Sequence, residues 1–132
     1  MYKTDFINKN VLVTGRTGFK GSWLFAWLSM PGENVISLSG RIPAKLSHYK
    51  LIKDCFWKDL RFDIRGLSKY QDVLSNLKPD YIFHLAAQPI VLLSYKSPLD
   101  TINTNIIGIA NILEAMRNFT HDCITVMITS DK

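Results

Sequence analysis

The sequence has few cysteines and no long apolar run, and each of these absences excludes a class of protein. Cys55 and Cys123 are its only cysteines, so a disulfide framework is excluded and we expect two reduced, buried or half-buried thiols. No apolar run reaches the roughly 18 residues of a membrane span, and the polar start of the chain is unlike a secretory signal peptide. We therefore expect a cytoplasmic protein with no membrane partner.

Blocks of like charge, internal repeats and low-complexity tracts are also missing. The formal net charge is +5, but the lysines and arginines are scattered, which argues against nucleic-acid binding and suits a phosphate-bearing ligand. The histidines have no metal-ligand spacing, so we expect no metal site, and His84 is predicted to be a core residue. A chain of 132 residues with 47% hydrophobic residues is typical of one globular domain.

Three glycines follow the first apolar run. Residues 11–13 are typical of a short buried strand, and Gly15, Gly18 and Gly21 follow before a helix begins. In a phosphate-binding turn the first glycine permits a tight turn, the second leaves room for a pyrophosphate, and the third lets helix and strand pack closely. Amide N–H groups at the helix start then point at the anion. The pattern predicts a nucleotide site, and a plain strand-to-helix turn is the alternative.

Apolar periodicity predicts the other elements. Further strands are expected at residues 35–38, 57–62, 81–87 and 124–128, with 57–62 nearer a sheet edge. Helices are expected after the glycine turn, at 67–77 and at 98–118, and a loop with room for a short helix at 41–54. The residues expected on the buried face of the first helix are Phe19, Trp23, Ala26, Trp27 and Met30.

This alternation of strands and helices predicts an α/β fold. The expected architecture is a doubly wound parallel sheet of about five strands in three αβα layers. Ligands of such sheets bind beyond the carboxyl ends of the strands, where the strand order reverses. Gly15, Ala86 and Thr129 each end a predicted strand, so we expect them to converge on one crevice.

Six strings carry a family resemblance. They are VTGRTGFKGSW, DIRG from Asp63, HLAAQP from His84, SYKSP from Ser94, TNIIGIANILEA from Thr104 and TSDK from Thr129. In this order they resemble the extended short-chain dehydrogenase/reductase family, and most closely its CDP-glucose 4,6-dehydratases, of which they match only the first part. The resemblance implies a truncated NAD(P)-binding Rossmann-type domain over residues 1–132, a nucleotide-sugar substrate and a homodimer in the full-length form.

The resemblance also implies where NAD binds. Asp63 matches the partner of the adenine amine, although without the family it fits a turn residue at a strand end. Ala86 and Ala87 match the segment beneath the cofactor, and they equally fit packing residues under a helix. A hydrogen bond that ties strands together near the cofactor would account for Asn105, a poor helix former, and so would simple tolerance of that residue. The matching positions are Gly15, Thr17, Gly18, Phe19, Lys20, Gly21, Asp63, Ile64, Leu85, Ala86, Ala87, Gln88, Asn105 and Thr129.

Ser130, Asp131 and Lys132 match the family's catalytic strand end. In relatives the hydroxyl residue polarises the sugar 4-OH, and the next two residues, one acidic and one basic, serve the loss of water. After oxidation at C4, a 4-keto group acidifies the C5–H bond, so a base removes that proton while an acid protonates the departing 6-OH. Read without the family, adjacent Asp and Lys are an ordinary solvated pair.

Several departures limit what the resemblance implies. No acid stands at residues 37–41 to hold the adenosine 2′-OH, and Arg41 would suit a 2′-phosphate, so NADP is the alternative to the NAD that the family implies. Arg16 replaces a usual histidine, and Leu92 and Leu93 stand where an arginine is usual. The family's Tyr-x-x-x-Lys pair follows the fifth strand and is not among these residues, so we expect no turnover by this polypeptide alone.

Two other functions stay open. One is a different extended reductase, such as a nucleotide-sugar 4-epimerase, although an epimerase has no need of the acid and base in S-D-K. The other is a non-catalytic NAD(P)-binding module.

Overall fold

A five-stranded parallel sheet with helices on both faces makes up the computed structural model, which describes residues 4–29, 34–40 and 58–129. The strands are β1 (Asn10–Thr14), β2 (Asn34–Ser39), β3 (Asp59–Arg61), β4 (Tyr81–His84) and β5 (Ile124–Met127). The α-helices are α1 (Phe19–Ser29), α3 (Leu67–Leu77), α4 (Val91–Lys96), α5 (Pro98–Ile102) and α6 (Gly108–Arg117). A 3-10 helix, Thr4–Phe6, precedes β1. The predicted α/β fold is confirmed.

The strand order determines at which edge of the sheet a ligand is expected. It runs β3-β2-β1-β4-β5, every pairing is parallel, and β3 lies at an edge as predicted. Successive strands therefore run outward from β1 in one direction and then from β4 in the other. The order reverses between β1 and β4, so a ligand is expected beyond the carboxyl ends of those two strands.

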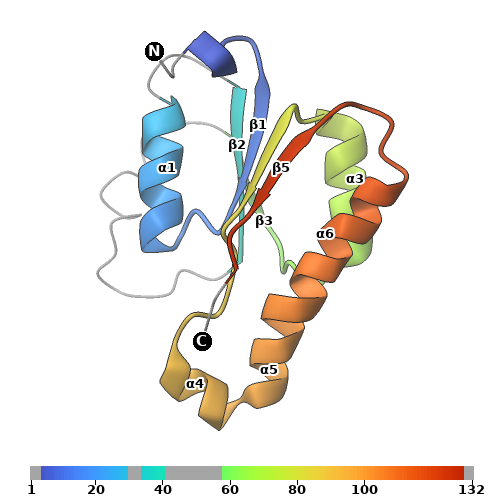
Figure 1. The fold of residues 1–132 in the computed structure, drawn as a ribbon. Coiled ribbons are helices and arrows are strands. Elements are labelled where there is room, and N and C mark those ends of the chain that lie inside the picture. The colour runs from blue at the N-terminus through green and yellow to red at the C-terminus, as the bar shows by residue number, and fades with distance from the viewer. Residues whose placement is uncertain (1–3, 30–33, 41–57, 130–132) are drawn as a thin grey trace.

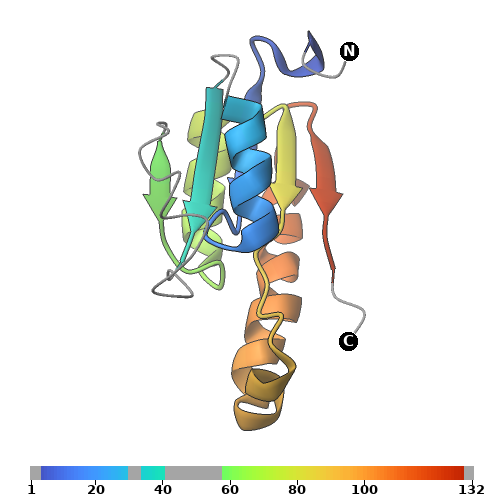
Figure 2. The same cartoon turned by 90° about the vertical axis from the view of Figure 1, so that its left-hand side faces the viewer.

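Two apolar layers hold the sheet between its helices. Leu12 on β1 faces α3 and α6, whereas its neighbours Val11 and Val13 face α1, because successive side chains of a strand alternate between faces. Figures 1 and 2 show α1 on one face and α3 with α6 on the other. The layer against α3 and α6 has the larger buried cluster: Leu12, Leu38, Ile64, Tyr70, Leu74, Ile82, Ile112 and Ala115.

The predicted buried face of α1 is wrong. Phe19 is 73% exposed and Trp23 is 54% exposed, whereas Phe25 and Leu28 are buried against the sheet. Trp27 is 40% exposed and contacts only the edge of Phe6 among the ring pairs of the described chain. Small residues at the start of the helix explain the difference, because Gly21 and Ser22 turn toward the β1 exit and set which face is buried. Met30 lies outside the described residues.

Two further elements differ from the prediction. Strand β4 ends at His84 and not at residue 87, and the following segment forms the short helix α4, which the periodicity did not indicate. The helix expected at 98–118 is continuous but contains a π-helical turn, Asn103–Ile107, between α5 and α6. The predicted loop at 41–54 lies outside the described residues. Within the described residues, no helix has the length and apolar character to cross a membrane.

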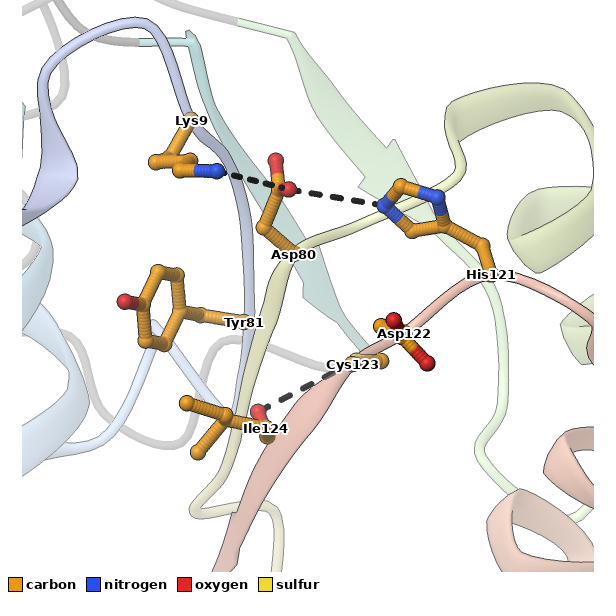
Figure 3. A pocket seen from close by; sticks show the side chains of 7 residues that line it. All are labelled: Lys9, Asp80, Tyr81, His121, Asp122, Cys123 and Ile124. Atoms are coloured by element: carbon orange, nitrogen blue, oxygen red, sulfur yellow. Dashed lines mark hydrogen bonds and ion pairs between the residues drawn. The ribbon is translucent and has the colours of Figure 1, made fainter.

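An acidic residue joins the amino ends of three strands. Asp80, just before β4, accepts hydrogen bonds from the backbone N–H of Asn10 at 2.9 Å and from Lys9 Nζ at 3.3 Å. His121 Nε2 lies 3.4 Å from the same carboxylate, and Asp80 O accepts from the N–H of Ile124 on β5. These groups line a shallow hollow at the end of the sheet away from the β1 exit turn (Figure 3). Cys123 beside them is half-buried and unbridged, as predicted.

We predict that Asp80 makes folding stability sensitive to acid. Its pKa lies below the usual value, chiefly because the Asn10 N–H donates to the carboxylate. A carboxylate with a lowered folded-state pKa stabilises the fold above its unfolded pKa, near 3.9, and that contribution is lost as pH falls through the folded pKa. Asp80→Asn should lower the urea midpoint at pH 7 more than at pH 3, and the exposed Asp72→Asn is the control. Equal losses at both pH values would contradict this role.

Candidate functional site

The chain leaves β1 through a glycine turn. Gly15 has φ +76°, a left-handed conformation that glycine adopts without strain, and its N–H donates to Leu38 O at 2.9 Å. The N–H of Gly18 then donates to Gly15 O at 3.0 Å, and helix α1 begins at Phe19. The first amide groups of a helix have no intrahelical acceptor, so this turn offers donors to an anion.

Two of the three glycines leave no room for a side chain. A Cβ on Gly15 would lie 2.6 Å from Ala86 N, and one on Gly21 would lie 2.3 Å from Gly15 O. The expected tight turn and close packing of helix on strand are therefore confirmed for these two glycines. A Cβ on Gly18 would meet only Gly15 O, at 3.3 Å. No other contact with the described residues is found there, as a pyrophosphate site requires, and the contact with a pyrophosphate stays a prediction.

Polar side chains at the ends of β1 and β4 contact one another and hold the chain where it leaves β4. Thr14 and His84 are paired in register, and Thr14 Oγ1 lies 2.8 Å from His84 Nδ1. The same hydroxyl accepts from the N–H of Ala86 at 3.2 Å. His84 is fully buried and burial lowers its pKa to about 4, so its ring is neutral at pH 7. His84 is a core residue as predicted. Thr14 was not among the predicted site residues, and the signal that could have found it is a pair of polar side chains at one register position.

The segment after β4 is also held at Gln88, two residues beyond Ala86. Asn105, in the π-helical turn, accepts from the N–H of Gln88 at 2.7 Å and donates to Gln88 O at 3.1 Å. We call residues 85–88 the strip. It lies directly against Gly15, so the predicted meeting of the β1 and β4 ends is confirmed. Thr129 follows Ile128, whose N–H donates to His84 O at 2.9 Å, which places the end of β5 at the same edge.

The predicted adenine-binding pair lies after β3. Asp63 is exposed and its carboxylate accepts from the N–H of Arg65 at 3.0 Å and from Arg65 Nε at 2.9 Å, so it does act as a turn residue. Ile64 is buried against Gly108, where an added Cβ would lie 2.8 Å from the Ile64 side chain. Asn111 Nδ2 donates to Arg65 O. These contacts join the Asp63 turn to α6, and adenine binding stays a prediction.

A buried arginine beneath the glycine turn was not among the predicted site residues. Arg16 is 2% exposed, its guanidinium carbon lies 4.0 Å from the centre of the Phe25 ring, and Nη1 donates to Ser37 Oγ at 3.3 Å. Asp59 Oδ1 lies 3.9 Å from Nη1, and Arg61 Nε donates to the other oxygen of Asp59. The arginine therefore ties the turn to β2 and β3, a role that no local pattern indicates.

The remaining predicted residues lie in the glycine turn, at the start of α1 or outside the described residues. Thr17 is buried in the turn, whereas Phe19 and Lys20 are exposed at the start of α1. Arg41, Ser130, Asp131 and Lys132 lie outside the described residues. Within the described residues no cluster of three or more His, Cys, Asp or Glu side chains could hold a metal ion.

We predict that His84 lowers stability in mild acid. The unfolded histidine, with a pKa near 6.5, binds a proton before the buried one does, so the free energy of unfolding falls as pH drops from about 6.5 toward 4. Between pH 7 and 5 this loss is on the order of 2 kcal/mol. His84→Gln should remove it from urea denaturation curves, and the exposed His121→Gln should not. An unchanged pH slope in His84→Gln would refute this.

We also predict that Gly21→Ala is strongly destabilising. Alanine is the better helix former by roughly 1 kcal/mol, but its Cβ would collide with the carbonyl of Gly15, which is backbone and not a movable side chain. The net loss in unfolding free energy should be about 2 kcal/mol or more. Gly40→Ala is the matched control, because the nearest atom to its Cβ among the described residues is Phe62 O, 3.9 Å away. Equal urea midpoints for the two variants would contradict the close packing.

Sequence comparison agrees with this geometry. The profile of the GDP-mannose 4,6 dehydratase family matches residues 12–131. The CDP-glucose 4,6-dehydratase of Salmonella typhimurium is 38% identical over 98% of this chain and 36% of its own length. The GDP-mannose 4,6-dehydratase of Vibrio cholerae serotype O1 is 33% identical over 84% of this chain and 32% of its own. The chain thus spans about a third of the length of these relatives.

Solved structures share the fold. The UDP-glucose 4-epimerase of Stenotrophomonas maltophila, solved with bound NAD, superposes with a TM-score of 0.71 at 26% identity, over 86% of this chain and 34% of that one. The NAD complex of UDP-glucose 4-epimerase from Thermus thermophilus gives 0.69 at 30% identity, over 83% and 34%. With the family profile covering nearly all of its length, this chain belongs to the GDP-mannose 4,6-dehydratase family of extended short-chain dehydrogenases/reductases.

Proposed function

We propose that residues 1–132 are the NAD-binding Rossmann domain of a nucleotide-sugar 4,6-dehydratase that converts CDP-glucose to CDP-4-keto-6-deoxyglucose. The observation that carries the proposal is the close contact of the Gly15 turn with the strip at the point where strand order reverses. The match to the Salmonella CDP-glucose enzyme supports the substrate. The catalytic tyrosine region and the substrate domain would belong to a longer polypeptide.

The residues present fit a dinucleotide. Among the described residues a Cβ on Gly18 would face only Gly15 O, which would leave room for a pyrophosphate at the first amides of α1. Ala86 and Ala87 lie beyond β4 at the same edge, and their small side chains would leave room for a nicotinamide ribose. Bound NAD supplies a hydride acceptor at the sugar C4 and later returns the hydride.

The proposed chemistry is divided among Ser130, Asp131 and Lys132. Ser130 would hydrogen-bond the sugar 4-OH and help to fix its position. Asp131, as a neutral acid, would protonate the departing 6-OH, and Lys132, as a neutral amine, would remove the proton from C5. Each of the two needs a shifted pKa, upward for the acid and downward for the amine, which burial in a closed site provides.

NAD is the proposed cofactor and NADP is the alternative. The solved relatives named above bind NAD, which favours the first. The end of β2 and the two residues that follow it, Gly40 and Arg41, provide no acid for a 2′-OH. Asp59 on the neighbouring strand does not replace it, because its carboxylate is already held by Ser37 and Arg61.

A nucleotide-sugar 4-epimerase is the second candidate, because solved epimerases share this fold at up to 30% identity. The two reactions differ in mass balance: a dehydratase product has lost one water, whereas an epimerase product has the mass of its substrate. Mass spectrometry of CDP-glucose treated with a longer form of the enzyme that includes the tyrosine region would separate them. A non-catalytic binding module would give neither product but would still bind the dinucleotide.

We predict that the 132-residue chain binds NAD or NADH. Calorimetric titration should show saturable binding, and Gly18→Ala should weaken it at least about tenfold, because a methyl group would occupy the pyrophosphate side of the turn. Ser75→Ala, an exposed change on α3 away from the glycine turn, should bind as the unaltered chain does. Repeating the titration with NADP decides between the cofactors. No heat and no thermal shift at millimolar dinucleotide, on protein shown to be folded by circular dichroism, would refute the site.

A further inference from the structure

The end of β2 is bordered by a charged pair on the neighbouring strand β3. Asp59 and Arg61 stand two residues apart on β3, so their side chains share one face of the strand, and Arg61 is paired in register with Ser39, the last residue of β2. Arg61 Nη1 donates to the backbone oxygen of the next residue, Gly40, at 3.3 Å. A guanidinium therefore lies where dinucleotide-binding sheets usually have the acid that holds the adenosine 2′-OH.

The carboxylate of Asp59 is held from two sides. Its Oδ1 accepts from Ser37 Oγ at 2.6 Å and lies 3.9 Å from Nη1 of the buried Arg16. Its Oδ2 accepts from Arg61 Nε at 2.8 Å and lies 2.6 Å from Arg61 Nη2. Arg16 stands where relatives usually have histidine, and because a guanidinium is not deprotonated in proteins, its charge is permanent. The contacts of Oδ1 therefore fix the carboxylate with Oδ2 toward Arg61.

The two arginines beside Asp59 differ in exposure. The side chain of Arg61 is 37% exposed, whereas that of Arg16 is 2% exposed, so Arg61 is the one within reach of a ligand. A guanidinium presents a planar fork of N–H donors, which binds a phosphate through two hydrogen bonds at once. The Asp59 carboxylate repels a phosphate and competes with it for the same donors.

We propose that Asp59 is a specificity-determining residue that makes this chain prefer NAD to NADP. By holding the Arg61 guanidinium, the carboxylate withholds the cation that a 2′-phosphate needs, and it places a repulsive charge near the end of β2. A 2′-OH is uncharged, so NAD meets neither obstacle. The inference deepens the proposed function and rests on it for the presence of a dinucleotide. It accounts for a preference for NAD at a strand end that has no acid of its own.

Asp59→Asn tests the proposal through the ratio of two affinities, measured by fluorescence titration with NADPH and NADH. Asparagine keeps an acceptor for Ser37 but loses the charge that holds Arg61, so NADPH affinity should rise about fivefold or more relative to NADH affinity. High salt should reduce the gain by screening. Glu114→Gln is the matched control, because it releases Arg117 from an ion pair on α6 and should leave the ratio unchanged. General loss of structure weakens both cofactors alike and does not move the ratio.

Arg61→Gln should move the ratio in the opposite direction. It removes the cation and leaves the carboxylate, so NADPH affinity should fall relative to NADH affinity, and the double variant Asp59→Asn/Arg61→Gln should lose the gain of Asp59→Asn. Arg117→Gln is its control. Arg61→Gln keeps the contacts of Asp59 with Ser37 and Arg16, so it decides the question if Asp59→Asn does not fold.

Failure of this inference can be told apart from failure of the proposed function. Tighter binding of NADPH than of NADH by the unaltered chain would overturn the inference alone. So would an unchanged ratio in either single variant, or a gain in Asp59→Asn that persists in the double variant. If the folded, unaltered chain binds neither dinucleotide, the proposed function fails and the inference fails with it.

Discussion

The structure depends on a close approach of backbone to backbone at the exit of β1. The Gly15 turn lies against the peptide groups of Leu85 and Ala86, and the first turn of α1 lies against Gly15 in turn. A single Cβ at Gly15 or Gly21 would come within 2.6 Å of main-chain atoms. Interiors are close-packed and main chain relaxes little, so these two positions fix the separation of β1, β4 and α1.

Buried polar groups at this edge serve geometry more than stability. The Thr14 hydroxyl contacts both His84 Nδ1 and the amide of Ala86. His84 Nε2 has no hydrogen-bond partner within the described residues. A buried polar atom without a partner costs free energy, and a histidine that must stay neutral costs more in acid. An apolar pair at the same register position would avoid both costs but could not hold the Ala86 amide. Such a trade is typical of a functional edge.

Much of the fold followed from periodicity, and the exceptions have identifiable causes. Helix α3 was predicted at its observed bounds because large apolar residues recur on the face that packs. In α1 they recur on the wrong face, since Trp23 and Trp27 are exposed while the small residues Gly21 and Ser22 are buried. The π-helical turn was not predicted because a wide turn leaves no composition signal beyond a weak helix former such as Asn105. Arg16 was missed because its partners are distant in sequence.

The two ends of the sheet are stabilised by different means. At the amino end, Asp80 gathers a backbone amide, a lysine and a histidine, so the polar groups there are used by one another (Figure 3). At the carboxyl end the strands are held by main-chain contact and by neutral hydrogen bonds to Ala86 and Gln88. Residues 15–21 contain no carboxylate that would oppose an anion near the positive end of the α1 dipole. The carboxyl edge is therefore compatible with the dinucleotide pyrophosphate that we propose for it.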